Sequence, residues 1–143
     1  MSQKFPPEAR QIMDERFHRD SLISLATADG TVPSVRTVNA FYEDGSFYII
    51  TYALSGKIKQ IEKNPNVAVC GDWFTAHGIG ENLGHIRAAE NTEIAERLRR
   101  AFSDWYGNGH TNEDDPNTVI LRVRLTDGML MSHGTRYEID FRG

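Results

Sequence analysis

The strongest constraint on the fold of this chain comes from two Asp-Gly pairs that interrupt strand-like runs of residues. Asp29-Gly30 lies between residues 21–28 and 33–42, and Asp44-Gly45 lies between residues 33–42 and 47–52. Asp-Gly between apolar runs is a strong signal for a tight β-hairpin turn. Parallel strands need crossover connections of a dozen or more residues, so the sequence predicts that these three strands are antiparallel.

The rest of the chain predicts three helices and further strands. A helix is expected after Pro6-Pro7, a second from Ser55 to Asn64, and a third from an Asn91 cap to Trp105. Strands are predicted at residues 67–74, 75–89, 119–125, 129–131 and 136–141, with a bulge among the glycines of 75–89 and a turn at Asp127-Gly128. This indicates one domain, residues 1–143, of the mainly β (α+β) class: an antiparallel, Greek-key-like barrel of six to seven strands with peripheral helices.

Composition narrows the classes of function. The formal net charge is -4, so no overall positive field is present to attract nucleic acid. No apolar run reaches the roughly 20 residues of a membrane span, and residues 1–7 lack the apolar core of a signal peptide. The single cysteine, Cys70, excludes an internal disulfide and predicts a cytoplasmic protein, and its apolar neighbours predict a buried, unreactive thiol.

A candidate anion site combines two cations with the start of the second helix. Arg36 lies on the second predicted strand, and Lys57 follows Ser55-Gly56 in the first helical turn. Two positive charges, hydroxyl groups and free helix N–H groups can converge on one phosphate. A cation in a first turn opposes the helix dipole, which favours a ligand role for Lys57. The alternative is that both are ordinary surface charges of a barrel, and the residue pattern leaves both interpretations open.

Other motifs do not indicate a known chemistry. Gly78, Gly80 and Gly84 lack the spacing of a dinucleotide fingerprint, and no helix follows them directly. The five histidines lack the tight spacing of metal ligands, so no metal site is predicted. No Ser-His-Asp or Cys-His arrangement is visible from spacing, and the catalytic residues stay unassigned.

Four segments together resemble the pyridoxamine 5′-phosphate oxidase-like flavoproteins. They are residues 33–38, the strand end Ile50-Thr51, residues 55–61 and residues 64–69, and their order and spacing are similar to those of the family. The resemblance implies a split β-barrel homodimer with FMN bound at the subunit interface.

The resemblance also implies roles for individual residues. Arg36 and Lys57 would hold the FMN phosphate, the backbone of residues 37–39 would line the isoalloxazine, and the second subunit would contribute Trp73 and Asn82. For Trp73, a core aromatic that closes the barrel is the alternative. The complete set of expected cofactor-binding residues is Arg36, Thr37, Val38, Asn39, Ile50, Thr51, Ser55, Gly56, Lys57, Trp73 and Asn82.

The chain departs from true pyridoxamine phosphate oxidases near its end. Residues 132–137 lack the tryptophan and basic cluster of the substrate-binding segment in those enzymes, so the resemblance supports FMN better than the vitamin substrate. The leading hypothesis is an FMN-binding oxidoreductase that acts on an unknown small molecule. The alternatives are a non-catalytic flavin- or haem-binding or stress protein, a deazaflavin-dependent reductase, and a dimeric barrel without a cofactor.

Overall fold

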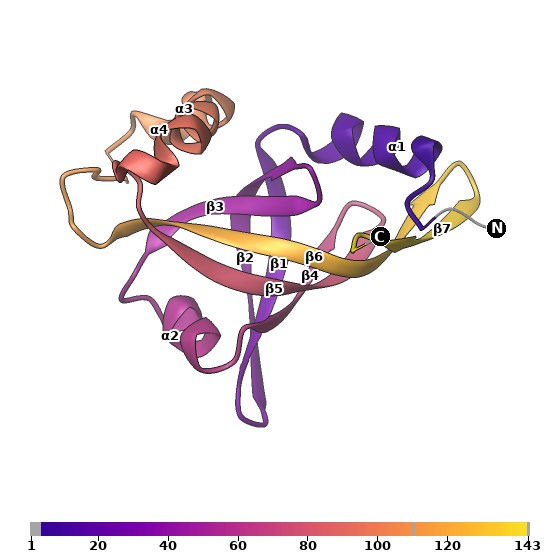
Figure 1. The fold of residues 1–143 in the computed structure, drawn as a ribbon, viewed down its shortest axis with the longest axis horizontal. Coiled ribbons are helices and arrows are strands. Elements are labelled where there is room, and N and C mark those ends of the chain that lie inside the picture. Colours follow the sequence, from indigo (N-terminus) through magenta and orange to yellow (C-terminus); the bar gives the residue numbers. More distant parts are fainter. Residues whose placement is uncertain (1–3, 110, 143) are drawn as a thin grey trace.

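Residues 4–109 and 111–142, which the computed structural model describes, form an antiparallel sheet with peripheral helices (Figure 1). The strands are β1 (Ser21–Asp29), β2 (Val32–Glu43), β3 (Ser46–Tyr52), β4 (Asn66–Gly71), β5 (Phe74–His85), β6 (Thr118–Ser132) and β7 (Thr135–Asp140). The helices are α1 (Pro7–Phe17), α2 (Gly56–Lys63), the 3₁₀ turn η1 (Ala89–Asn91), α3 (Thr92–Ala101) and α4 (Ser103–Tyr106).

The strands close into a barrel through one additional pairing. Their order is β3-β2-β1-β4-β5-β6-β7, and β3 also pairs with β6. The first six strands of this order therefore form a closed antiparallel barrel, from which β7 extends as an extra strand on β6. This confirms the predicted fold class.

Both Asp-Gly turns are confirmed. β1 and β2 pair as far as Asp29 opposite Val32, and Gly30 lies in the two-residue loop with a φ of 63°. Asp44-Gly45 forms the β2–β3 loop, with φ values of 49° and 82°. Positive φ matches the right-handed twist of the flanking strands, which is why these residue types occupy such loops.

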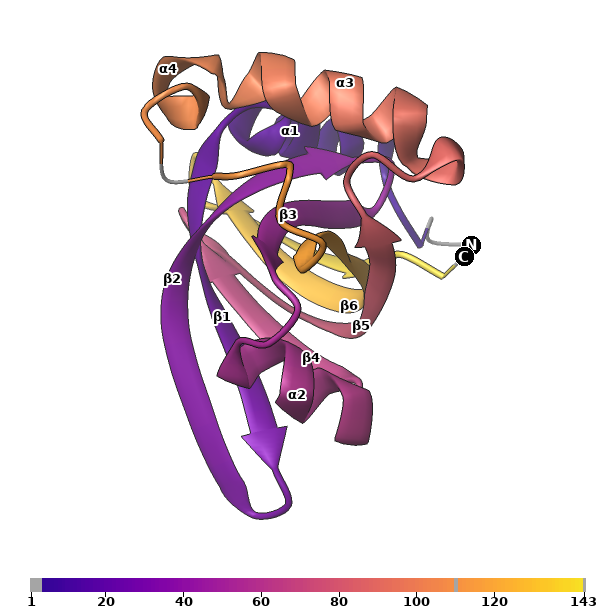
Figure 2. The ribbon, with the colours of Figure 1, turned by 90° about the vertical axis from the view of Figure 1, so that its left-hand side faces the viewer.

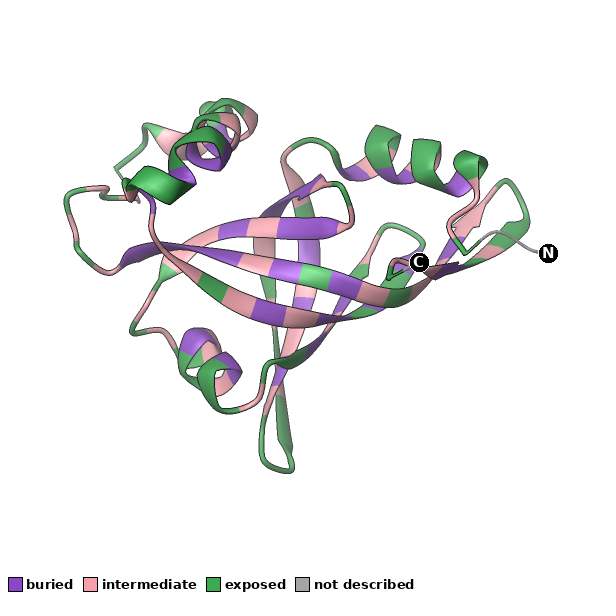
Figure 3. Cartoon of the chain, viewed as in Figure 1, coloured by how far each residue is buried: buried purple, intermediate pink, exposed green. Residues whose placement is uncertain are grey.

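Two apolar clusters form the core, and Figure 3 shows the alternation of buried and exposed positions along the strands. The larger cluster fills the barrel and includes the buried α1 residue Phe17, whose ring centroid lies 5.5 Å from that of Phe47. The smaller cluster lies between α3 and the outer side of the sheet. Side chains of β3 alternate between the two, so that Phe47 belongs to the first and Ile50 packs against the second.

The barrel is split between β2 and β3. The two strands pair only where Phe41 to Glu43 face Tyr48 to Ser46, whereas β3 pairs with β6 along its whole length. Residues 32–40 of β2 therefore have β1 on one side and, within the described part of the chain, no strand on the other. We call residues 32–40 the open edge, because alternate backbone N–H and C=O groups there have no strand partner. Figure 2 shows β2 curving away from β3, with α2 beside the gap.

The pairing of β5 with β6 is irregular near the glycines of β5, as predicted. The register with β6 shifts between His77 and Gly78 and again between Asn82 and His85. A side chain at Gly78 would place its Cβ 2.9 Å from the backbone oxygen of Arg124. The close approach of β6, rather than a ligand, therefore accounts for this glycine.

One predicted strand and one predicted turn are corrected by the structure. The strand predicted at residues 67–74 ends at Gly71, and Asp72-Trp73 form a two-residue loop into β5. No turn occurs at Asp127-Gly128, because β6 continues through both residues. A Cβ at Gly128 would lie 3.0 Å from the Thr75 oxygen, so the glycine allows close packing inside the sheet.

Three further local predictions are wrong. The helix expected to reach Trp105 is interrupted after Ala101, where α3 ends and the short α4 follows. Asn91 does not cap α3 with its side chain, which is buried and donates to the Leu83 backbone oxygen instead. Cys70 is exposed, because the alternation along β4 buries its neighbour Val69 and turns the thiol outward.

Candidate functional site

Arg36 is anchored on β2 by its neighbours on β1. Its Nη1 donates to the Leu25 backbone oxygen at 3.2 Å and to Thr27 Oγ1 at 2.8 Å. Partial burial lowers the pKa of the Arg36 guanidinium. No carboxylate pairs with it among residues 4–109 and 111–142. The guanidinium is therefore fixed in place while its charge is left without a counter-ion.

Lys57 brings a second cation to the same place from the first turn of α2. Burial, followed by the positive charge of Arg36, lowers the pKa of the Lys57 ammonium. Within the described ranges no ion pair or hydrogen bond engages Lys57. Two neighbouring cations without an acid repel one another, and a bound anion would remove that repulsion. We call Arg36, Lys57 and Ser55 the cation clamp.

Ser55 contributes an unsatisfied hydroxyl group to the cation clamp. It occupies the predicted N-cap position of α2, but its side chain makes no capping hydrogen bond. Its Oγ is buried and has no hydrogen-bond partner in the part of the chain that the structure describes. Buried polar atoms are nearly always bonded, so this one indicates a missing ligand. Beside it, a Cβ at Gly56 would meet no atom within 4 Å, which leaves open space at the helix start.

A buried polar network fixes α2 against the β1–β2 hairpin at this site. The Thr27 hydroxyl, which accepts from Arg36, donates to Gln60 Oε1, and Gln60 Nε2 lies 3.5 Å from Ser34 Oγ. Sequence reasoning missed Thr27 and Gln60. Their types carry no ligand signature, and only the packing of α2 against the β1–β2 hairpin brings them together.

The predicted ring-contacting residues lie on the open edge. Thr37 is exposed, Val38 packs partly against the barrel core, and the Asn39 side chain donates to Asp20 Oδ1 at 2.9 Å. Because these residues follow Arg36 on the same strand, the structure brings them together with the cation clamp as expected. Their unpaired backbone groups can donate to and accept from a planar ligand along the edge.

Ile50 and Thr51 lie at the end of β3, opposite Ile120 and Val119 of β6. Ile50 packs against the cluster beneath α3, whereas Thr51 is half-buried just before the turn into α2. The backbone N–H of Ser55 donates to the Tyr52 oxygen at 3.0 Å and so ties that turn to β3. The strand that carries Ile50 and Thr51 therefore leads directly into the start of α2, where Ser55 and Lys57 lie.

Trp73 lies apart from the cation clamp, at the tip of the β4–β5 hairpin. It is 70% exposed and has a φ of 52°, so the alternative of a core aromatic is wrong. Arg16 of α1 holds this tip by donating to the backbone oxygens of Asp72 at 2.9 Å and Met131 at 2.7 Å. An exposed tryptophan on a braced, strained loop is typical of a contact residue.

Asn82 lies on a strand that carries no residue of the cation clamp. It lies on β5 opposite Leu121, is exposed, and accepts from the backbone N–H of Gly84 at 2.9 Å. Trp73 and Asn82 thus belong to β5 and the loop before it, whereas the cation clamp belongs to β2 and the start of α2.

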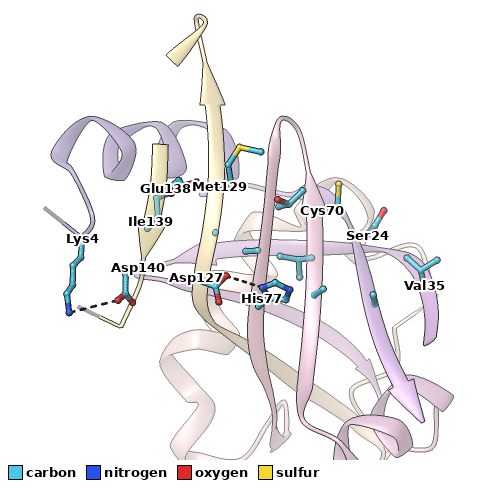
Figure 4. A pocket seen from close by; sticks show the side chains of 16 residues that line it. Lys4, Ser24, Val35, Cys70, His77, Asp127, Met129, Glu138, Ile139 and Asp140 are labelled. Carbon is cyan, nitrogen blue, oxygen red and sulfur yellow. Dashed lines mark hydrogen bonds and ion pairs between the residues drawn. The ribbon is translucent and has the colours of Figure 1, made fainter. Parts of the chain in front are cut away.

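A groove of about 780 Å³ runs over the outer face of β1, β4, β5 and β6 (Figure 4). Its lining includes Cys70 and a hydrogen-bonded pair in which His77 Nδ1 lies 3.0 Å from Asp127 Oδ2. This bond to His77 lowers the pKa of the Asp127 carboxyl. None of the eleven cofactor-binding residues expected from the sequence lines this groove. Its size alone therefore does not make it the reactive site.

A smaller cleft of about 370 Å³ lies where β2 meets α3. Its lining is rich in charged and aromatic side chains: His18, Arg19, Asp20, Phe41, Arg97, Arg100 and Ala101. Asp20 connects this cleft to the open edge, because the same carboxylate accepts from Asn39. The open edge therefore reaches this cleft near Asn39, three residues beyond Arg36.

The split barrel, the open edge and the cation clamp together define the class of fold and place two cations without an acidic partner, among the described residues, between β2 and α2. Residues 9–131 match the family model described as pyridoxamine 5′-phosphate oxidase, and the chain belongs to this family. The resemblance seen in the sequence is thereby confirmed.

The chain is also similar to individual proteins in sequence or in fold. The chain is 29% identical over 117 residues to general stress protein 26 of Bacillus subtilis strain 168, covering 79% of this chain and 81% of that one. A FAD-binding protein from Mesorhizobium loti shares the fold with a TM-score of 0.66 at 16% identity, over 82% and 90% of the two chains. A haem-binding protein from Mycobacterium smegmatis does so with a TM-score of 0.63 at 11% identity, over 86% and 54%.

Proposed function

We propose that this protein binds FMN and catalyses a flavin-dependent redox reaction on a small molecule. The observation that carries the proposal is the cation clamp, in which two neighbouring cations lack an acidic partner and a buried hydroxyl lacks a hydrogen-bond partner within the described residues. A phosphate would neutralise Arg36 and Lys57 and would accept a hydrogen bond from Ser55. Membership of the pyridoxamine 5′-phosphate oxidase family supports the same cofactor.

The open edge is the expected place for the flavin ring. From Arg36 to Asn39 the strand advances three residues, or about 10 Å at 3.3 Å per residue. The ribityl chain separates the phosphate of FMN from its ring, so a phosphate at the cation clamp leaves the ring along residues 37–39. Unpaired backbone groups there would orient the ring, and bound flavin would supply electron or hydride transfer.

The proposal includes a homodimer in which each copy completes the pocket of the other. Leu22 and Trp73 are 66% and 70% exposed, and the β1–β4 register, with Ser24 opposite Cys70, places Leu22 beside the Trp73 loop. Exposed apolar side chains grouped in this way favour burial against another protein surface. A second copy seated on the outer groove would cover Trp73 and bring it, with Asn82, to the flavin of its partner.

A cytoplasmic location accompanies the proposal. Cys70, the single cysteine of the chain, is an exposed thiol, which fits a reducing compartment. None of the helices in the described residues combines the length and apolar character that crossing a membrane requires.

A flavin-binding stress protein without turnover is the second candidate. It is favoured by the 29% identity to general stress protein 26. It is also favoured by the cation clamp itself, where no histidine or carboxylate is bonded to Arg36 or Lys57 within the described ranges. A deazaflavin phosphate could use the same clamp, and a haem protein would instead need an axial ligand.

The experiment that tests the proposal begins with the visible spectrum of the purified protein and the mass of the ligand that heat releases. FMN mass and absorbance near 450 nm are expected, whereas a deazaflavin or haem mass would assign the site to another cofactor. Arg36→Ala with Lys57→Ala should give folded, colourless protein, and Lys59→Ala on the exposed side of α2 should stay yellow. Stoichiometric FMN in the double variant would refute the phosphate assignment.

Reduction of the bound flavin separates the two candidates. Flavin that is reduced by a pyridine nucleotide and reoxidised by an added acceptor would support an oxidoreductase. Flavin that stays oxidised with every donor tested would support the stress protein without turnover.

A further inference from the structure

Asp20 joins three parts of the chain that are far apart in sequence. It lies in the connection between α1 and β1, and each of its carboxylate oxygens accepts one hydrogen bond. Asn39 Nδ2 of β2 lies 2.9 Å from Oδ1, and Trp105 Nε1 of α4 lies 2.9 Å from Oδ2. Because a carboxylate only accepts, both neighbours must be donors, which defines the orientation of the Asn39 amide.

The partners of Asp20 are unusual for a partly buried carboxylate. Both donors are neutral, and no cation forms a salt bridge with Asp20 in residues 4–109 and 111–142, although arginines line the adjoining cleft. Partial removal of an ionised group from water is unfavourable unless hydrogen bonds replace the lost hydration. The bonds from Asn39 and Trp105 replace that hydration here, and they hold both side chains in one position.

The Asn39 anchor acts on the part of β2 that has the least other support. The open edge is held by β1 on one side alone, with Asn39 opposite Leu22. A side-chain bond from Asn39 to Asp20 therefore restrains the open edge close to where β2 begins to pair with β3, three residues beyond Arg36. Trp105 is itself held against Phe102, with ring centroids 5.0 Å apart, so the bond also restrains α4.

We propose that Asp20 is a positioning residue for the flavin ring. It holds the backbone of Val38 and Asn39 in the shape that accepts the ring and docks Trp105 at the same end of the open edge. The inference rests on the proposed FMN function. It extends the cofactor-binding residues beyond the cation clamp, to the α1–β1 connection and to α4.

The test compares FMN binding by four variants. Asp20→Ala removes both acceptors and should raise the FMN dissociation constant roughly tenfold, as expected for loss of a charge-assisted bond. Asp20→Asn should recover most of the affinity, because its amide can accept from Trp105 and donate to a rotated Asn39 amide. Trp105→Phe keeps the ring but removes the donor, and should weaken FMN binding in the same direction. Asp104→Ala, an exposed neighbour on α4, is the matched control and should bind as the wild type does.

Two readouts distinguish positioning from general stability. Titration of flavin fluorescence gives the dissociation constant, and near-ultraviolet circular dichroism of the bound flavin reports ring orientation. A residue that only stabilised the fold would lower the melting temperature and leave both readouts unchanged. If Asp20→Ala fails to fold, Trp105→Phe decides, because it leaves the Asp20–Asn39 bond intact.

The possible outcomes are separable. Weaker FMN binding by Asp20→Ala or Trp105→Phe, with an altered flavin spectrum and recovery in Asp20→Asn, would support the inference. Equal FMN affinity in the wild type and all folded variants would overturn the inference and leave the proposed function standing. A wild-type protein that binds no FMN would overturn the proposed function, and the inference with it.

Discussion

Arg36 and Lys57 lie close enough for the charge of Arg36 to lower the pKa of the Lys57 ammonium, and neither has an acidic partner among the described residues. This pair comes from two elements, β2 and α2, that the Thr27–Gln60 hydrogen bond holds together. A protein that fixes two cations side by side stores electrostatic repulsion in its ligand-free state. An anion bound between the two cations would remove this repulsion and so stabilise the folded protein.

Lys57→Gln should therefore stabilise the ligand-free protein, raising its melting temperature by roughly 1–3 °C. Because the folded state lowers the pKa of Lys57, it binds protons less tightly than the unfolded chain does. The wild-type free energy of unfolding should thus rise as pH approaches the usual lysine value of 10.5, and the variant should lack this rise. Thermal melts with and without FMN measure both effects. Lys59→Gln is the control, and an unchanged melting temperature in Lys57→Gln would contradict the prediction.

Glu113→Gln should destabilise the loop that packs on α3. Mainly through its bond from Arg99, and also through Tyr106 and Arg87, the Glu113 pKa is lowered to about 2. Loss of these charge-assisted bonds should cost roughly 1–3 kcal/mol at pH 7. The folded-state pKa is depressed, so this stabilisation is complete above the usual value of 4.5 and disappears as pH falls toward 2.

Urea unfolding at pH 7 and at pH 3 tests the Glu113 prediction. The difference between wild type and Glu113→Gln should shrink at the lower pH. Asp114→Asn, whose side chain is 81% exposed, should change the free energy of unfolding by less than about 0.5 kcal/mol. An equal effect of both substitutions would show that the buried position of Glu113 is unimportant.

Gly78→Ala should destabilise the barrel by roughly 1–3 kcal/mol, the usual cost of overpacking. The new methyl group would lie 2.9 Å from the Arg124 backbone oxygen, which cannot move without disturbing β6. Gly107→Ala is the matched control, because a Cβ there meets nothing within 4 Å and the φ of -85° suits any residue. Urea midpoints measure the difference, and equal midpoints would show that the β5 bulge accommodates a side chain.

Trp73→Ser should weaken the proposed homodimer at least roughly tenfold, as is typical when a central tryptophan is removed from an interface. Leu22→Ser should act in the same direction because Leu22 lies beside the Trp73 loop. Leu54→Ser changes an exposed apolar residue in the connection between β3 and α2 and serves as the control. Sedimentation equilibrium measures the association, and a wild-type monomer at all concentrations would disprove the homodimer.

Much of the fold follows from local patterns in the sequence. Asp29-Gly30 and Asp44-Gly45 require turns, since each supplies the backbone conformations that two-residue hairpins need. Strand alternation separates the two faces of β3, and the cation clamp is recognisable because Ser55 and Lys57 start a helix close after a strand. Such signals depend on neighbours along the chain, so the sequence carries them in full.

The misplaced elements depend on contacts between distant segments. Asp127-Gly128 has the composition of a turn, yet β5 presses so closely on β6 there that glycine is needed within a strand. Trp73 is a large aromatic residue of the kind that usually lies in a core. Arg16 of α1 holds the loop that contains it, and the Trp73 side chain is exposed. Propensity is a weak preference, and tertiary packing outweighs it at both positions.

The residues of the site also fall into those that the sequence predicts and those that only the folded structure brings together. The residue types and spacing of Arg36, Ser55 and Lys57 predict an anion site before any fold is known. The role of the Asp20 carboxylate is visible only in the folded chain. Pairing of β1 with β2 brings Asn39 to it, and packing of α3 and α4 brings Trp105, which is 85 residues away. A hydrogen bond between side chains requires both atoms within about 3 Å of each other. For residues this far apart, no sequence pattern specifies that distance, and it is set by strand pairing and by the packing of α3 and α4.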